Sequence, residues 1–135
     1  MINSKIIKLA SITKNVGLKN KFTHKSSIKN SLCGDLIKTE FVVSDSKIKS
    51  MRYETESCIL CEASASLFSR KIINSEIKDL KKDILKFKKL KKNFSYEFPS
   101  KFKEFNQLVD KKNFYRINCV ILPMEAFLKA FKIYK

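Results

Sequence analysis

The sequence is poor in glycine, proline and histidine and has no tryptophan. Its 135 residues include two glycines, two prolines and one histidine. No glycine- or proline-rich linker divides the chain, and this length favours a single domain over residues 1–135. The glycine-rich phosphate loop, the G-x-S-x-G nucleophile motif and a Ser/His/Asp set are all missing, which argues against the common nucleotide-binding and serine-hydrolase classes.

Long apolar runs are also missing. No stretch approaches the ~20 apolar residues that a membrane-spanning helix needs. The N-terminal MINSKIIKLASITK has lysines but only short apolar patches, so it does not predict a signal peptide. Residues 1–34 contain no acidic residue, as in transit peptides, but they also lack arginine. We therefore predict an ordinary first helix and a cytoplasmic protein with no membrane partner.

Acidic charge is scarce, because 13 Asp and Glu stand against 29 Lys and Arg, giving a net charge of +16. Arginine occurs only at positions 52, 70 and 116. Lysine, isoleucine, asparagine and phenylalanine are abundant together, and they share A/T-rich codons, so codon bias explains much of the lysine. A basic module for nucleic acid stays an alternative, since positive charge attracts phosphate whatever its origin. The lysine run 78–92 argues against it, because aromatic residues are sparse there and no RNA-binding motif accompanies the run.

The first half of the chain predicts a short helix followed by strands. The helix is expected over residues 5–14, and the polar segment 18–32 leaves room for a short strand. In CGDLIKTEFVV the apolar residues alternate, which is typical of a strand with one buried face. Ser44-Asp45-Ser46 is turn chemistry, and residues 48–54 predict a return strand with Met51 and Tyr53 on one side.

After Cys58 the apolar period changes from two towards 3.6, which predicts helices. The stripe of the next helix is Cys61, Ala65, Phe68 and Ile72, and that of the following one is Ile77, Leu80, Ile84 and Phe87. Asn74-Ser75 is read as the cap of that second helix, residues 101–110 as a further short helix, and Pro123 as the first turn of a last helix. The order predicts an α+β fold: a small antiparallel sheet packed with N-terminal and C-terminal helices.

Three of the four cysteines are predicted at joints between elements. Cys33 precedes a strand, Cys58 lies between a strand and a helix, and Cys119 is expected in the loop before the last helix. Asp35 follows Cys33 with a glycine between, so the two side chains can turn towards one point. Three thiolates and a carboxylate could hold zinc, with Arg116 as a nearby cation. On chemistry alone, however, buried free thiols are the more common case.

Cys61 and His24 are weaker candidates. Cys61 lies on an apolar helical stripe, so a core cysteine is favoured over a zinc ligand or a redox partner of Cys58. A thioredoxin-like C-x-x-C also needs a βαβ context that this order of elements does not supply. His24 is read as a surface residue and kept only as a weak site candidate.

Three motifs in order resemble the iron–sulfur scaffold family of IscU, SufU and the N-terminal domain of NifU. NSLCGD (30–35) resembles N-P-x-C-G-D, SCILCEASAS (57–66) resembles G-C-x-x-x-x-A-S-A-S, and RINCVILPMEAFLKAF (116–131) resembles the segment with the third cysteine. The resemblance runs from about Asn30 to the C-terminus, and residues 1–29 match poorly. Three features are closest to the SufU branch. They are the spacing of 61 residues from Cys58 to Cys119, the arginine at position 116, and Asn118 in place of the usual IscU histidine.

The resemblance implies a fold and a function in iron–sulfur cluster biogenesis. Cys33, Asp35, Cys58 and Cys119 would bind one zinc ion. The protein would accept persulfide sulfur from a SufS-like cysteine desulfurase, in the manner of a sulfurtransferase, and pass it to the downstream assembly machinery. Cys33 is the first choice of sulfur acceptor and Cys119 the second, with Arg116 supporting the site. The IscU-like alternative is a scaffold that assembles a transient iron–sulfur cluster on Cys33, Cys58 and Cys119.

Three positions depart from the family pattern. Ser31 stands where the family usually has proline, and Ser57 stands where it usually has glycine. Cys61 occupies a position that is not usually cysteine in the family. None of them removes a ligand, but Cys61 could compete as a fourth thiol.

Overall fold

A computed structural model describes residues 4–31, 34–93, 100–109 and 114–132. Its centre is an antiparallel sheet in the order β1-β2-β3, formed by His24–Lys29, Leu36–Ser44 and Lys47–Glu56. The buried face of the sheet carries Ile37, Phe41, Met51 and Tyr53. Alternation of apolar and polar residues sets this face, because successive strand residues point to opposite sides. The predicted hairpin and its inward-facing residues are therefore confirmed.

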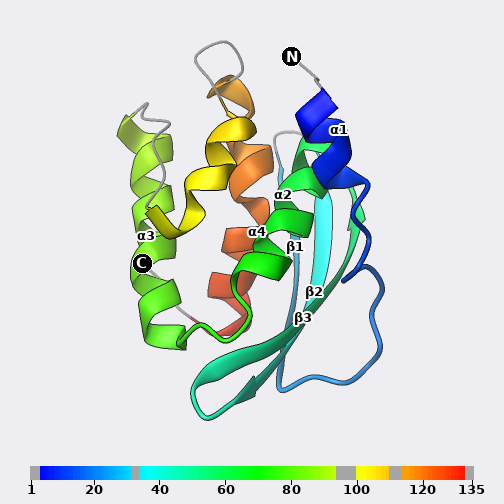
Figure 1. The fold of residues 1–135 in the computed structure, drawn as a ribbon, viewed down its shortest axis with the longest axis vertical. Helices are drawn as coiled ribbons and strands as arrows, with labels where there is room; N and C mark the ends of the chain where they lie inside the picture. Colours follow the sequence, from blue (N-terminus) through cyan, green and yellow to red (C-terminus); the bar gives the residue numbers. More distant parts are fainter. Residues whose placement is uncertain (1–3, 32–33, 94–99, 110–113, 133–135) are drawn as a thin grey trace.

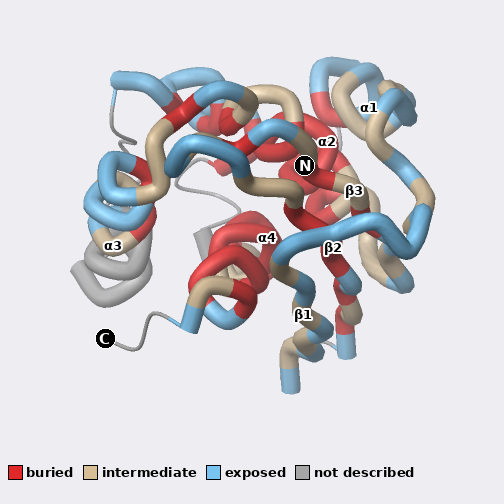
Figure 2. Tube along the Cα trace, turned by 90° about the horizontal axis from the view of Figure 1, so that it is seen from below, coloured by how far each residue is buried: buried red, intermediate tan, exposed pale blue. Residues whose placement is uncertain are grey.

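Helices cover one face of this sheet (Figure 1). They are α1 (Ser4–Ala10), α2 (Ile59–Lys71), α3 (Ile77–Asn93) and α4 (Ile117–Ala130), with 3-10 turns η1 (Ser100–Gln107) and η2 (Phe114–Arg116) before α4. Helices α2 and α4 lie directly on the sheet and are buried along most of their length, whereas the described part of α3 shows an exposed outer side (Figure 2). The predicted α+β fold is confirmed. Within the described residues, no helix is both long and apolar enough to cross a membrane.

The turn between β2 and β3 is a two-residue hairpin loop. Asp45 and Ser46 have φ of 54° and 63°, as expected of a turn whose twist matches that of the strands. The α2–α3 connection is tied to this hairpin, since the N–H of Asn74 donates to the carbonyl of Ile48 (2.7 Å). Asn74 has a φ of 65° and lies in the connection. Reading it as the cap of α3 was wrong, because α3 begins three residues later.

Small residues let α2 and α4 pack closely. Ala63, Ser64, Ala65 and Ser66 are all buried, and the Ser64 hydroxyl donates to the carbonyl of Val120 in α4. The predicted α2 stripe is confirmed, because Cys61, Ala65, Phe68 and Ile72 are fully buried.

The start of α4 was predicted wrongly. Pro123 lies in the interior of the helix, whose first residue is Ile117. A proline inside a helix removes one backbone hydrogen bond. Here every residue from Cys119 to Met124 is buried, so tertiary packing holds the helix across that position.

The N-terminal helix is shorter than predicted. It ends at Ala10, where the Ser11 hydroxyl donates to the carbonyl of Lys8 (2.7 Å). The chain then runs along the edge of β3: the N–H of Gly17 donates to the carbonyl of Tyr53 and the N–H of Tyr53 to the carbonyl of Asn15. These bonds cover the open strand edge, which helical residues could not do.

The remaining predicted elements are present with adjustments. The segment predicted as a helix over 101–110 is the 3-10 turn η1, in which Phe102 and Phe105 are buried three residues apart. That spacing fits the three-residue repeat of a 3-10 helix. On α3, four lysines of the predicted solvated face are exposed: Lys78, Lys81, Lys82 and Lys86.

Candidate metal centre

Three potential metal ligands meet at one end of the molecule. One ligand atom each of Asp35, Cys58 and Cys119 lies within 4.8 Å of the others. Asp35 and Cys119 are buried and Cys58 is half-buried. Asp35 immediately precedes β2, Cys58 immediately precedes α2, and Cys119 lies in α4. All three elements begin at the upper end of Figure 1.

A tight turn positions Asp35. The β1–β2 connection is closed by two backbone bonds of 2.7 Å: the Asn30 N–H donates to the carbonyl of Asp35, and the Gly34 N–H donates to the carbonyl of Asn30. Gly34 has a φ of 79°, a conformation that glycine adopts without the steric cost of a Cβ. This turn places the carboxylate of Asp35 beneath the start of α2.

Cys58 is the N-cap residue of α2, but its own side chain makes no capping hydrogen bond. Asp35, from the β1–β2 connection, supplies an acceptor at this helix end: its Oδ1 accepts from the Cys58 N–H (3.2 Å), and its Oδ2 accepts from the Cys58 thiol (3.3 Å). A carboxylate at a helix N-terminus is also favoured by the helix dipole. The sequence analysis missed this second role of Asp35. The only sign of this role in the sequence was that position 58, at the start of the helix, carries none of the usual capping residues Ser, Thr, Asp or Asn.

Cys119 lies in the first turn of α4, not in a loop before it. The prediction of a loop followed from reading Pro123 as the first turn. The third residue of a buried helix still reaches the cluster, because α2 and α4 pack side by side with their N-termini at the same end (Figure 1).

The electrostatics of the cluster favour a thiolate at Cys58. The pKa of its thiol is lowered to about 6, chiefly by a hydrogen bond with Cys119. Burial and the Asp35 carboxylate act in the opposite direction. The donor set thus holds up to three negative charges in a small, largely buried volume, which needs a compensating cation.

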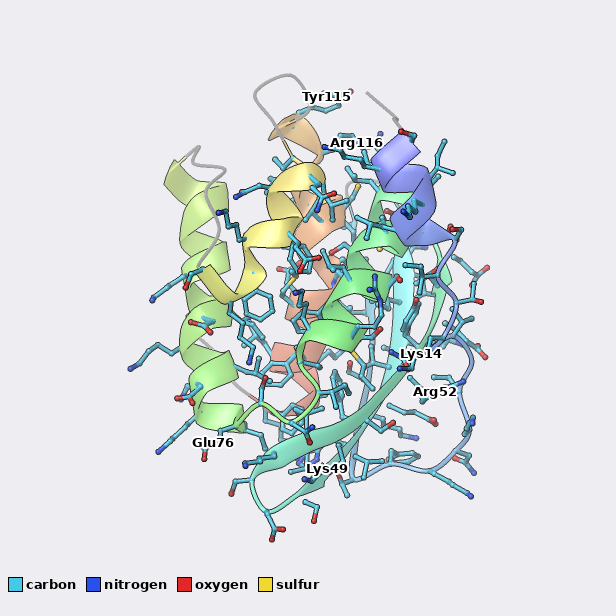
Figure 3. All side chains as sticks on the ribbon, in the orientation of Figure 1. Lys14, Lys49, Arg52, Glu76, Tyr115 and Arg116 are labelled. Carbon is cyan, nitrogen blue, oxygen red and sulfur yellow. The ribbon has the colours of Figure 1, made fainter. Side chains whose placement is uncertain are left out.

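Arg116 supplies part of that compensation. Its pKa is raised, first by a hydrogen bond with Cys119 and further by the charge of Cys58. Arg116 lies in η2 immediately before α4, and Figure 3 shows it with Tyr115 at the upper end of the molecule. Tyr115 is 68% exposed beside the site. Within the described part of the chain, the buried Oδ1 of Asn118 has no hydrogen-bond partner.

The other candidate residues divide into three cases. Cys33 lies outside the described residues, so its role stays a prediction. Cys61 is fully buried, as predicted for a core cysteine. His24 stacks on Phe131 with 4.2 Å between ring centroids, at the opposite end of α4 from Cys119. Twelve residues of helix separate that end from the cluster by about 18 Å, so His24 is not part of it.

The residues present fit a thiophilic metal. Ligands of a tetrahedral zinc ion lie about 4 Å apart, since Zn–S bonds are about 2.3 Å long. A separation of at most 4.8 Å therefore needs only small side-chain movements. Two thiols, a carboxylate and a balancing arginine suit zinc or iron better than magnesium or calcium, which prefer oxygen ligands throughout.

The chain belongs to the family described as the NifU-like N terminal domain, whose profile matches residues 1–135. This confirms the resemblance seen in its three motifs. A curated relative, the iron-sulfur cluster assembly scaffold protein IscU of Thermotoga maritima, is 30% identical over 105 residues, covering 77% of this chain and 73% of the relative.

Solved structures share the fold. The N-terminal NifU-like protein of Brucella abortus superposes with a TM-score of 0.85 at 17% identity, covering 97% of this chain and 92% of that one. A putative scaffold protein for the SUF system from Fervidobacterium islandicum superposes with a TM-score of 0.82 at 22% identity, covering 96% and 95%.

Proposed function

We propose that this protein acts in iron–sulfur cluster assembly, and that the cluster of Asp35, Cys58 and Cys119 is its working site. The convergence of these ligand atoms within 4.8 Å is the observation that carries the proposal. Membership of the NifU-like family and a relative named as an assembly scaffold support it. Cys33 completes the proposed set as its fourth ligand.

The finer proposal is that the protein accepts persulfide sulfur from a SufS-like cysteine desulfurase and passes it to the assembly machinery. Zinc bound by Cys33, Asp35, Cys58 and Cys119 would keep the thiols deprotonated and protected from oxidation. A carboxylate is a hard ligand among soft thiolates, so the shell is expected to open when the desulfurase docks.

The freed thiolate attacks the outer sulfur of the enzyme persulfide. A new S–S bond forms on the acceptor, the S–S bond of the enzyme breaks, and the enzyme cysteine leaves as a thiolate, so no external electrons are needed. Cys33 is the first candidate acceptor because glycine follows it in the sequence, and Cys119 is the second. Arg116 is proposed to stabilise Cys119 as a thiolate, in line with its hydrogen bond to that sulfur.

A desulfurase assay without iron tests sulfur transfer. The protein is mixed with a cysteine desulfurase and cysteine, and alanine formation and intact mass are followed. We expect faster turnover and a sulfur adduct on one cysteine. Cys33→Ser should abolish the adduct, whereas Cys61→Ala, which changes a thiol outside the cluster, should retain it. The reverse pattern would contradict the assignment of Cys33.

Cluster scaffolding is the second candidate function, and the name of the Thermotoga relative favours it. Here iron and sulfide are the cargo, held by Cys33, Cys58 and Cys119. Anaerobic addition of iron and sulfide should then produce visible absorption bands of a labile cluster, which Cys58→Ser and Cys119→Ser abolish and Cys61→Ala does not. If sulfur transfer is absent with a matched desulfurase and these bands appear, scaffolding replaces the carrier proposal.

A further inference from the structure

Cys58 and Cys61 occupy the first turn of α2 in different roles. Cys58 is the half-buried N-cap residue, and Cys61, three residues later, is fully buried. Cys61 is outside the three-residue ligand cluster. The proposed function leaves it without a task.

The backbone holds the two residues within range of a covalent bond. Residues three apart in the first turn of a helix have Cα atoms about 5 Å from each other. Disulfides form at Cα separations of about 4.4–6.8 Å, so closure needs side-chain rotation and little backbone movement.

Both side chains lie on the sheet-facing side of α2. The thiol of Cys58 donates to Asp35 at the start of β2. Cys61 lies near Tyr53 of β3: burial is the largest cause of the raised pKa of Tyr53, and Cys61 contributes in the same direction. Closure of a Cys58–Cys61 disulfide requires the Cys58 side chain to rotate away from Asp35.

We propose that Cys58 and Cys61 form a reversible oxidation site, which closes as a disulfide under peroxide. The sulfur of Cys58 attacks a peroxide oxygen, the O–O bond breaks, and the other oxygen leaves as water with the thiol proton, giving a sulfenic acid on Cys58. The thiol of Cys61 then attacks that sulfur. An S–S bond forms and the oxygen leaves as water, so the two electrons of the disulfide have gone to the peroxide.

The burial of Cys61 suits the second step and not the first. Peroxide reaches the half-buried Cys58, while Cys61 is fully enclosed and stays reduced until the neighbouring sulfenic acid forms. Cys119 also lies close to Cys58, so it is the competing thiol that the experiment must separate from Cys61. Closure with Cys61 withdraws Cys58 from Asp35 and Cys119, which takes one donor out of the candidate metal centre. The disulfide itself does not depend on the proposed function, since it forms in metal-free protein.

Tryptic mapping of the full-length protein tests the pair directly. Residues 53–70 contain no lysine or arginine before Arg70, so one fragment carries both cysteines and neither Cys33 nor Cys119. Metal-free protein is treated with hydrogen peroxide and unfolded in guanidinium chloride so that buried thiols can react. Free thiols are then blocked with N-ethylmaleimide, and the protein is digested. We expect this fragment to be unblocked and lighter by two hydrogen atoms, and to take two blocking groups after dithiothreitol.

Two variants complete the experiment. Cys119→Ser should give the same internal disulfide. In Cys61→Ala, Cys58 should instead be oxidised further to sulfinic acid, which dithiothreitol does not reduce. Circular dichroism checks that this variant is folded, and Cys61→Ser replaces it if it is not. A wild-type fragment that stays fully blocked, or is cross-linked to the fragment carrying Cys33 or Cys119, would overturn the proposal. So would equal amounts of sulfinic acid in wild type and Cys61→Ala.

Discussion

At the scale of single residues, Asp35 links the candidate metal centre to the fold. It is 6% exposed, and its two carboxylate oxygens accept from the backbone and the thiol of Cys58. The same group therefore caps α2 and offers an oxygen ligand. These two roles can be separated by substitution.

Asp35→Asn should weaken metal binding while leaving the fold largely intact. The amide oxygen can still accept from the Cys58 N–H, but it carries no charge to bind a cation. Loss of a residue that merely supports a ligand costs about 10–100-fold in metal affinity, so loss of a ligand should cost at least about tenfold. Competition with a chromophoric zinc chelator measures this.

Asp35→Ala is the matched variant. It should lose the same affinity and also destabilise the protein by about 1–3 kcal/mol in urea unfolding, because the start of α2 loses its acceptor. If Asp35→Asn binds zinc as tightly as the wild type, Asp35 is not a ligand.

Gly34→Ala tests the turn that positions Asp35. Among the described residues, and apart from its chain neighbours, a Cβ at this position would meet no atom within 4 Å, so the expected effect comes from the backbone. A φ of 79° costs an alanine about 1 kcal/mol relative to glycine, and urea unfolding should show that loss. Gly34→Asn should lose less, because asparagine tolerates this conformation better. An unchanged stability in Gly34→Ala would mean that the turn relaxes.

At the scale of elements, the contact between α2 and α4 sets the distance between Cys58 and Cys119. Ser64 is buried in this contact and donates to the carbonyl of Val120. Each cysteine lies in the first turn of its helix or just before it, so a shift of one helix against the other would move the two sulfurs apart.

Ser64→Leu should separate the two helices, whereas Ser64→Ala should not. The alanine loses one hydrogen bond, worth about 1 kcal/mol. The leucine adds bulk to a filled contact, which typically costs about 1–3 kcal/mol in addition. Urea unfolding gives the stabilities, and zinc affinity should fall only in Ser64→Leu. Equal zinc affinity in a folded Ser64→Leu would show that the helix contact does not set the geometry of the site.

A second link between elements holds the N-terminal segment against the sheet. Arg52 of β3 donates to the carbonyls of Lys14, Val16 and Gly17, and its cross-strand neighbour Glu40 accepts from the amides of Lys19 and Asn20. Figure 3 shows Arg52 beside Lys14 on this side of the molecule.

Arg52→Ala should release this segment locally. Three hydrogen bonds are lost, so amide hydrogen exchange over residues 14–20 should accelerate by at least about tenfold, with little change in the core. Lys49→Ala, an exposed substitution on the same strand, is the control. If exchange is equal in the two variants, the backbone bonds to Tyr53 hold the segment without Arg52.

The sequence predicted an element correctly where its apolar residues followed a clear local pattern. The alternation in β2 and β3 and the stripe of α2 were clear, because each pattern has one period and one buried face. The start of α4 was missed because Pro123 is a strong local breaker, and only tertiary burial, which the sequence does not display, overrides it. The edge pairing of residues 15–17 was missed because it uses backbone groups alone.

At the scale of the whole molecule, the candidate site is made by residues distant in sequence. Cys58 is 23 residues from Asp35 and 61 from Cys119. No local pattern predicts such convergence, so on residue chemistry alone buried free thiols were favoured. The resemblance in three motifs indicated the set, and the fold brings three of its members together. Cys33, the fourth predicted ligand, lies outside the described residues.

Part of the positive charge of the molecule lies on α3. Four exposed lysines lie on α3, which shows its outer side to solvent (Figure 2). Removing positive charge there, as in Lys78→Glu with Lys81→Glu, should leave metal binding unchanged. Any binding to random-sequence RNA should fall steeply with salt, since it would be carried by charge alone.

A cobalt titration tests the central claim most directly, because cobalt bound by thiolates gives intense charge-transfer bands and a tetrahedral visible spectrum. The account predicts one cobalt ion per chain with several thiolate ligands. The bands should be weakened in Cys33→Ser, Cys58→Ser and Cys119→Ser and unchanged in Cys61→Ala. A wild-type protein that gives no thiolate bands, or bands that disappear only in Cys61→Ala, would contradict it.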